Sequence, residues 1–192
     1  MTDMNDNLRG RIEWAINPYP NGTTEKIIKT NEHTCKQIRA QANKDEVEWG
    51  NLMIGQTSNK QWTTLLGEGL VRDVLKLLGK NPRNPQTKDG YRPDIETDDA
   101  IWEVKTRNWT VTGTAGEKVL GTMYKYSDIP TSYGKPLKIV CVGYQEYELT
   151  HGTTKIFGEV SANKKAYLDL ARTQHVEYVK FSDLVTDLLN DS

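Results

Sequence analysis

One strongly periodic stretch of hydrophobic residues lies at positions 61–80, in QWTTLLGEGLVRDVLKLLGK. Leu66, Leu70 and Val74 recur at four-residue spacing, so they share one face of an α-helix. Gly79 suits the end of this helix, because glycine adopts without strain the left-handed conformation that often follows a last turn. The pattern therefore predicts a helix over 61–80 with its apolar face against a core.

Other segments show the alternation of strands or the composition of helices, with turn residues between them. LKIVCVGY is largely apolar, which is typical of a central strand buried on both faces. HVEYVKF alternates between apolar and polar residues, and KIFGEV is expected to add a further strand. Residues 1–22 are polar and end in a turn cluster. Helices are predicted within 24–49, at about 115–127, at 162–174 and, with Ser182 as cap, at 182–191, and an irregular loop is predicted at 81–91.

The order of these elements predicts an α/β fold, with a mixed central sheet flanked by helices and a helical N-terminal extension. A length of 192 residues suits a single domain spanning 1–192. We place the α/β core at about 61–192 and the helical extension at about 1–60.

The segment YRPDIETDDAIWEVKTR, at 91–107, combines many acidic residues with strand-like alternation. If Asp98 and Asp99 form a two-residue turn, Asp94 and Glu103 lie directly opposite each other on neighbouring strands. Their Cβ atoms would then be about 4.5–5.5 Å apart.

Strand alternation decides which side chains of this hairpin share a face. Trp102 and Val104 build the side turned to the core, together with the apolar residue that faces Trp102. Asp94, Glu103 and Lys105 share the opposite side, at one end of the hairpin.

Two carboxylates in directly opposite positions repel each other, and a divalent cation reverses that effect. Mg²⁺ is held in proteins by one or two carboxylates, with water and substrate phosphate completing its coordination. Lys105 would lie beside the ion, where an amine orients or helps to deprotonate a water and balances charge on an attacked phosphate. The sequence therefore predicts a Mg²⁺ site with Asp94 and Glu103 as ligands.

Other registers and a simpler explanation stay open. A slip by one residue would turn Asp94 to the core side, whereas a four-residue turn at 97–100 would preserve its pairing with Glu103. TDDA lacks the Asn-Gly or Asp-Gly signature of a two-residue turn. The simpler explanation is a charged, solvated hairpin face with surface ion pairs. The apolar alternate positions around Glu103 favour the metal site.

The residues RPD, ending at Asp94, and WEVK, containing Glu103 and Lys105, resemble the motif of the PD-(D/E)XK nuclease superfamily. This group includes most type II restriction endonucleases, and the resemblance covers about 61–145. It implies a restriction-endonuclease-like core that hydrolyses phosphodiester bonds in DNA with Mg²⁺. Asp94 and Glu103 would be metal ligands, and Lys105 would assist the nucleophilic water.

Members of this superfamily often carry a further acid on the helix before the hairpin, and Glu68 matches it here. A surface ion pair between Glu68 and Arg72, one turn on, is the alternative. In some members a polar residue also lies near the site at the end of the next strand, which points more weakly to Gln145.

Sequence-specific cleavage needs contacts to base edges, which favour Arg, Lys, Asn and Gln. Two polar segments beside the predicted site supply such residues, KNPRNPQTK at 80–88 and TRNWTVTGTAGEK at 106–118, the second leading into a helix N-terminus suited to phosphate. The predicted DNA-binding residues are Arg83, Asn84, Gln86, Lys88, Arg107, Asn108 and Lys118. The basic helices of the N-terminal extension are either a recognition or dimer element or a solvated cap.

The charge balance, with 25 basic and 26 acidic residues, excludes bulk attraction to nucleic acid but leaves room for a basic cleft. No apolar run reaches the length of a membrane span, and the first residues do not resemble a signal peptide. We therefore expect a cytoplasmic protein without membrane partners.

These observations together predict a type II site-specific deoxyribonuclease that cuts double-stranded DNA at a short sequence. A homodimer is expected, because a two-fold pair fits a palindromic site. A junction resolvase or a repair nuclease of the same superfamily is the nearest alternative, although a markedly basic chain would favour it. A DNA-binding module without catalysis is the alternative from another class.

Overall fold

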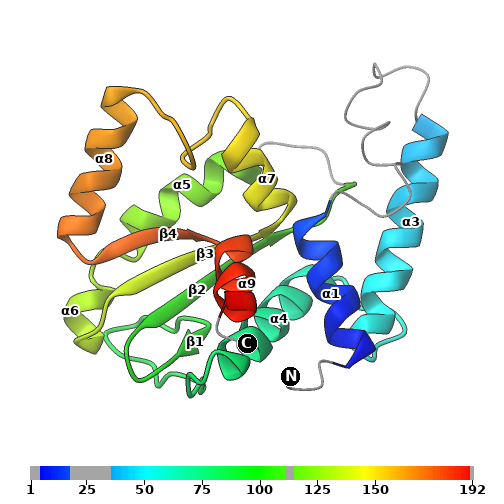
Figure 1. Cartoon of the computed structure of the whole chain (residues 1–192), viewed down its shortest axis with the longest axis horizontal. Coiled ribbons are helices and arrows are strands. Elements are labelled where there is room, and N and C mark those ends of the chain that lie inside the picture. The colour runs from blue at the N-terminus through cyan, green and yellow to red at the C-terminus, as the bar shows by residue number, and fades with distance from the viewer. Residues whose placement is uncertain (1–4, 18–35, 111–114, 191–192) are drawn as a thin grey trace.

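The computed structural model describes residues 5–17, 36–110 and 115–190 (Figure 1). In chain order, the described elements are α1 (Asp6–Ile16), α3 (Lys36–Met53), α4 (Trp62–Leu77), β1 (Ile95–Glu96), β2 (Ile101–Arg107), α5 (Ala115–Lys125), α6 (Ile129–Tyr133), β3 (Leu137–Gly143), α7 (Tyr144–His151), α8 (Ala162–Thr173), β4 (Val176–Lys180) and α9 (Phe181–Asn190).

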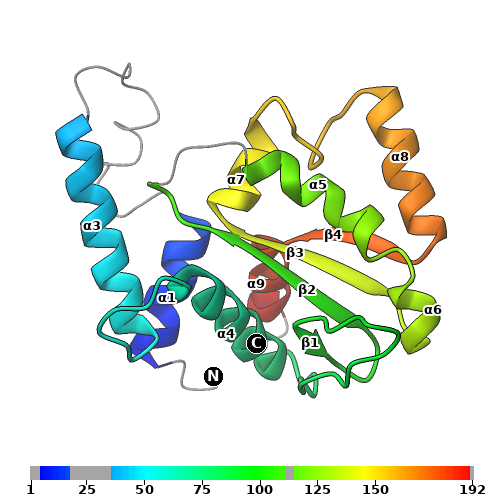
Figure 2. The same ribbon diagram turned by 180° about the vertical axis from the view of Figure 1, so that it is seen from behind.

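Within the described residues the strands form one four-stranded sheet in the order β1-β2-β3-β4. β1 is antiparallel to β2, whereas β2, β3 and β4 run parallel to one another. Helices α5, α7 and α8 lie above the sheet, and α1, α4 and α9 lie below it (Figures 1 and 2). This mixed sheet with flanking and N-terminal helices confirms the predicted fold class.

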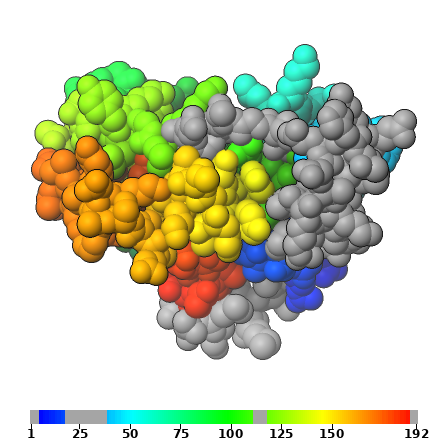
Figure 3. All heavy atoms as spheres, turned by 90° about the horizontal axis from the view of Figure 1, so that it is seen from above, coloured from blue at the N-terminus to red at the C-terminus, as the bar shows by residue number. Residues whose placement is uncertain are grey.

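Alternate residues of β2 enter different hydrophobic clusters, because successive side chains of a strand point to opposite faces. Trp102 and Val104 pack below the sheet with residues of α1, α4 and α9. Ile101 packs above it with Ile129 of α6 and Ile139 of β3. The upper face is covered by α5, α7 and α8, which lie next to one another when the molecule is seen from above (Figure 3).

Most predicted elements are found close to their expected bounds. The predicted helix at 61–80 is α4, and Gly79 adopts the left-handed conformation with φ of 69°. The predicted helix within 24–49 corresponds to α3, and the part of that range before residue 36 lies outside the described residues. None of the described helices is both long and apolar enough to cross a membrane.

Two expectations about local structure are wrong, and one helix lies where the sequence pattern had marked no individual helix. The segment 155–160 is not a strand, because Ile156 and Phe157 bond through their backbone N–H groups to the Leu149 carbonyl at the end of α7. Ser182 lies inside α9 and bonds to Glu146 instead of capping the helix. The polar segment 1–22 contains α1, which the sequence pattern did not reveal.

Helix α1 is part of the core although most of its residues are polar. Its residues Leu8, Ile12, Trp14 and Ala15 are buried against α4 and the sheet. Asn5 caps the helix by accepting a hydrogen bond from the Leu8 N–H. The N-terminal extension is therefore packed into the same hydrophobic cluster as the core.

A buried carboxylate joins α1, α3 and the residues that follow β2. Glu46 of α3 is fully buried and accepts hydrogen bonds from the Trp14 indole (3.0 Å) and from the Trp109 N–H (2.8 Å). It also accepts from the Thr110 N–H (3.0 Å) and hydroxyl (2.6 Å). Buried carboxylates are tolerated when their oxygens accept several such bonds. Glu46 thus ties the start of the chain to the end of the central strand.

Two glycines of α4 allow a matched test of how this helix packs on the sheet. A Cβ at Gly67 would lie 1.7 Å from the Thr106 hydroxyl of β2, whereas a Cβ at Gly69 would meet only Arg11 Nη1 at 3.7 Å. We expect Gly67→Ala to lower the free energy of unfolding by about 2 kcal/mol through overpacking. Gly69→Ala should raise it by about 0.5–1 kcal/mol, because alanine favours the helix.

Urea unfolding of both variants beside the wild-type protein measures this difference. Equal effects of the two substitutions would contradict the close approach of α4 to β2 at Gly67.

Candidate functional site

The hairpin of β1 and β2 has the register expected from a two-residue turn. Ile95 pairs with Trp102, and Glu96 pairs with Ile101. The Thr97 N–H donates to the Ala100 carbonyl at 2.9 Å, so the turn consists of the two residues between them. The slipped register and the longer turn are thereby excluded, and the next position before Ile95 lies beside Glu103.

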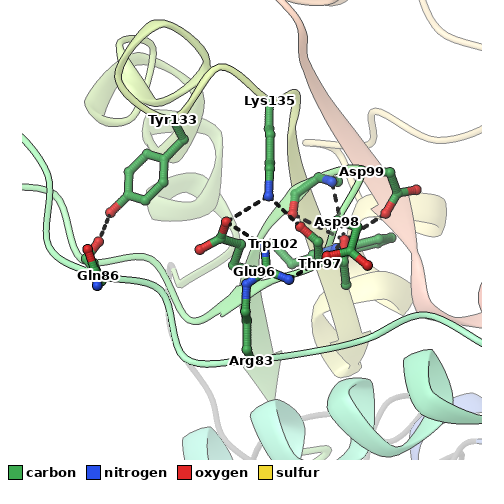
Figure 4. Close-up of polar contacts among 10 residues, drawn as sticks. Arg83, Gln86, Glu96, Thr97, Asp98, Asp99, Trp102, Tyr133 and Lys135 are labelled. Atoms are coloured by element: carbon green, nitrogen blue, oxygen red, sulfur yellow. Dashed lines mark hydrogen bonds and ion pairs between the residues drawn. The ribbon is translucent and has the colours of Figure 1, made fainter.

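The turn forms without glycine because Thr97 supplies hydrogen bonds from its side chain. The Thr97 hydroxyl donates to Asp99 Oδ1 at 2.7 Å and accepts from the Trp102 indole at 2.9 Å and from the Ala100 N–H at 3.2 Å (Figure 4). A fully buried threonine therefore replaces the usual turn dipeptide and fixes the hairpin register.

Asp94 lies immediately before β1 begins, at a position where the edge of β2 would otherwise be unpaired. Its Oδ2 accepts a hydrogen bond from the Val104 N–H at 2.7 Å. The carboxylate thus takes the place of a neighbouring strand and is held directly against the backbone of β2. This contact places the first predicted metal ligand at the edge of the sheet, beside Glu103.

Glu103 and Lys105 form an ion pair, with 2.6 Å between Lys105 Nζ and Glu103 Oε1. Both lie on the opposite face of β2 from Trp102 and Val104, as predicted. The Glu103 residue is only 3% exposed, and its Oε2 is buried without a hydrogen-bond partner. The simpler explanation was a solvated hairpin face with surface ion pairs. A buried carboxylate oxygen at Glu103 contradicts that explanation.

Glu68 of α4 joins this group by electrostatic interaction. Burial and the charges of Asp94 and Glu103 raise the pKa of Glu68. The guanidinium of Arg72 does not form the expected ion pair with it, but donates to Asn84 Oδ1 at 2.9 Å and to the Asp94 carbonyl at 3.4 Å. The structure thus favours Glu68 as a member of the site over the surface ion pair.

The electrostatic balance of the site is unfavourable for its negative charges. Burial raises the pKa of Asp94, although the bond from Val104 and the charge of Lys105 oppose the shift. Burial and the charge of Asp94 raise the pKa of Glu103. Burial lowers the pKa of Lys105, but the charges of Glu103 and Asp94 outweigh it and the net shift is upward. The site holds more negative charge than Lys105 compensates.

These residues fit a bound Mg²⁺ ion. The described residues contain no group of three or more His, Cys, Asp and Glu side chains arranged to hold a metal. Mg²⁺ nevertheless needs only one or two protein carboxylates when water and substrate phosphate complete its shell. The Glu103 Oε2 atom has no hydrogen-bond partner, and burial raises the pKa of both Asp94 and Glu103, so a bound cation would stabilise their charged forms. Asp94 and Glu103 would hold the ion.

Two of the residues predicted to contact DNA are in the protein interior. Arg107 is 5% exposed, pairs with Glu148 at 2.5 Å and lies over the Tyr144 ring. Asn108 is 7% exposed and donates to Glu46 Oε2 at 3.3 Å. Their burial contradicts a role in DNA contact. The Arg107 side chain instead bonds to Glu148 of α7, and the Asn108 side chain bonds to Glu46 of α3.

The loop 81–91 is held on the hairpin by backbone and side-chain contacts. Arg83 pairs with Glu96 through both backbone N–H groups, at 2.8 and 3.0 Å. Its guanidinium binds Glu96 at 2.9 Å and Asp98 at 2.5 Å, and Lys135 reaches the same Glu96 carboxylate at 2.7 Å (Figure 4). In this arrangement Arg83 stabilises the loop, and its contact with DNA stays a prediction.

Other predicted DNA-binding side chains are at the surface. Gln86, Lys88 and Lys118 are exposed. The Tyr133 hydroxyl donates to the Gln86 carbonyl at 2.6 Å, so the loop backbone is fixed while the Gln86 side chain stays exposed (Figure 4). Asn84 is also exposed and has its Oδ1 bonded to Arg72. These residues remain candidates for DNA contact.

Sequence reasoning missed residues that border the site. Tyr126, which follows α5, has its ring centroid 5.9 Å from Lys105 Nζ. Lys125 is exposed next to it, and Arg92 is exposed two residues before Asp94. Arg92 could have been predicted as a residue of the site because it lies two residues before Asp94. Nothing in the sequence indicates that the end of α5 lies close to β2. Gln145, which the sequence did name as a weaker candidate, is buried in α7 with its Nε2 lacking a partner.

Comparisons with protein-family models, with curated proteins and with solved structures find no match to this chain.

Proposed function

We propose that this protein is a Mg²⁺-dependent endonuclease of the PD-(D/E)XK type that cuts double-stranded DNA at a specific short sequence, as type II restriction endonucleases do. The observation that carries the proposal is the arrangement at the open edge of β2. Asp94 and the buried Glu103 lie side by side, and the amine of Lys105 is 2.6 Å from Glu103.

Each residue has a role that its position supports. Asp94 is fixed by the Val104 N–H, so its carboxylate is pre-oriented for a ligand role. Glu103 presents a buried oxygen without a partner. Lys105 holds positive charge close to where phosphate would lie and would orient the attacking water. Mg²⁺ bound by the carboxylates would polarise the phosphodiester group and stabilise charge that develops on it.

Glu68 is suited to a supporting role. It could transfer a proton as an acid or base, or it could hydrogen-bond to a water that Mg²⁺ would bind. Burial and the neighbouring carboxylates raise its pKa, which keeps a proton available closer to neutral pH. We propose that it assists the site without being a primary ligand.

The surface near the site supports DNA as the substrate. Gln86, Lys88, Arg92 and Lys125 are exposed on the loop 81–91, on the segment before Asp94 and at the end of α5. Side chains of these types bind phosphates and base edges. A homodimer would place two such sites on the two strands of a palindrome.

Incubation of the purified protein with a mapped plasmid and Mg²⁺ tests this function. We expect discrete fragments with Mg²⁺ and none with EDTA, because phosphodiester hydrolysis here requires the ion. A smear of products would favour a repair nuclease, and cleavage of branched DNA alone would favour a junction resolvase. Binding of DNA without cleavage of linear, supercoiled or branched substrates would contradict the proposal and favour a binding module.

A further inference from the structure

Tyr126 approaches the candidate site from an element that carries none of the predicted catalytic residues. It follows α5 and is half-buried, with its ring centroid 5.9 Å from Lys105 Nζ. This is within the range in which a cation is attracted to the face of an aromatic ring. The Tyr126 hydroxyl also favours the charged form of Glu103, by less than Lys105 does.

The ring of Tyr126 is held between two neighbours. Tyr91 contacts it edge to face, with 6.2 Å between the ring centroids and an interplanar angle of 68°. Lys125 Nζ lies 4.7 Å from the Tyr126 ring centroid. The Tyr91 hydroxyl donates to Asp128 Oδ2 at 3.0 Å, which ties Tyr91 to the segment that follows α5.

Tyr91 also belongs to the loop 81–91. It closes that loop through reciprocal backbone hydrogen bonds with Lys88, at 2.8 and 3.1 Å. Three residues further along the chain is Asp94. The Tyr91–Tyr126 contact therefore connects the loop, the first carboxylate and the surroundings of Lys105.

Lys105 needs a support other than Glu103 when Glu103 acts as a metal ligand. Its amine is held by the ion pair with Glu103 at 2.6 Å. A lysine side chain has many rotamers, and fixing one of them costs conformational entropy. The ring of Tyr126 contacts the Lys105 amine at 5.9 Å, and this contact does not depend on the Glu103 carboxylate. An error of about 1 Å in such a group can reduce a rate about 100-fold.

On the basis of the proposed nuclease function, we infer that Tyr126 is a positioning residue. Its ring restricts the Lys105 amine to the orientation needed for cleavage, and Tyr91 holds that ring in place from the loop 81–91. The loop that carries the exposed Gln86 and Lys88 is thereby coupled to the catalytic amine.

Single-turnover cleavage of plasmid DNA by the full chain with saturating Mg²⁺ tests this role, with DNA affinity measured in Ca²⁺ and thermal melting recorded for each variant. Tyr126→Leu should lower the cleavage rate constant by about 10- to 100-fold and leave the DNA Kd within about twofold. Tyr126→Phe keeps the ring and should recover a rate within about threefold of wild type. Tyr124→Leu, which removes an aromatic ring that is 86% exposed on α5, is the matched control and should cleave normally.

Tyr91→Leu provides a second variant that leaves Tyr126 in place, and we expect the same kind of rate loss with unchanged DNA affinity. Wild-type rates in Tyr126→Leu and Tyr91→Leu would overturn the inference while the nuclease proposal stood. A loss in Tyr126→Leu that matches a fall in melting temperature and in DNA affinity would also overturn it, because that result describes a structural residue. An inactive wild-type protein would refute the nuclease function itself.

Discussion

Replacing Lys105 with alanine is expected to lower the rate of DNA cleavage by about 100- to 1,000-fold, the loss typical of removing a group that stabilises developing charge. The Lys105 amine lies in the midst of the carboxylates, with Glu103 at 2.6 Å, and its side chain is 28% exposed, so a substrate can reach it. DNA affinity should change little, because one amine is a small part of a DNA interface. Plasmid cleavage under single-turnover conditions measures the effect.

Lys165→Ala on α8 is the matched control for this substitution. Lys165 is 66% exposed and pairs with Asp169 on its own helix, away from the candidate site. Its removal should leave the rate unchanged. A Lys105→Ala protein that cleaves as fast as the control would reject the assignment of the amine and with it the PD-(D/E)XK proposal.

Asp94→Asn is expected to have opposite effects on activity and on stability. The substitution removes the charge that a metal ion needs, so cleavage should fall by about 1,000-fold, but the amide oxygen can still accept the hydrogen bond from Val104. Because the charge of Asp94 raises the pKa values of Glu68 and Glu103, its removal should stabilise the metal-free fold by about 1 kcal/mol. Urea unfolding in EDTA, beside the cleavage assay, measures both effects.

The pH dependence of stability gives this prediction its sign. The pKa values of Glu68, Asp94 and Glu103 are raised in the folded protein, so the folded state binds more protons than the unfolded state just above the ordinary carboxyl pKa. This contribution to stability is full below the ordinary carboxyl pKa and is lost as the pH rises from there through the raised pKa values. The free energy of unfolding of the wild-type protein in EDTA should therefore fall with rising pH more steeply than that of Asp94→Asn.

Asp98→Asn is the control for the charge change, because the Asp98 side chain is 74% exposed and pairs with Arg83 at the far end of the hairpin. It should cleave normally and show the wild-type pH dependence. A less stable Asp94→Asn protein, with the same pH dependence as wild type, would show that Asp94 is a structural acid.

The hairpin and its acids could be predicted from sequence because they depend on local rules. Strand alternation fixed the faces of Trp102 and Glu103, and the pairing of Ile95 with Trp102 followed from the turn length. The same reasoning failed for Arg107, which is polar yet buried by its ion pair with Glu148, 41 residues away. Residue types alone do not distinguish a buried ion pair from an exposed cation.

Helix α1 and Tyr126 were missed because their importance arises from contacts between distant parts of the chain. Arg11 of α1 pairs with Asp73 of α4, so a polar helix face is satisfied inside the molecule. Tyr126 meets Lys105 only because α5 crosses back over the sheet between two parallel strands. Hydrophobic periodicity predicts local structure and does not reveal such contacts between distant segments.

The hydrogen bonds to Glu46 determine whether the chain can be divided into fragments that fold. A fragment that began after α3 would lack Glu46, which accepts from the Trp109 and Thr110 N–H groups, and Trp14, whose carbonyl accepts from the Trp109 indole. The boundary near residue 60, between the N-terminal extension and the α/β core, is therefore not a domain boundary. The part that carries the candidate site depends on α1 and α3 for these contacts, so neither half is expected to fold on its own.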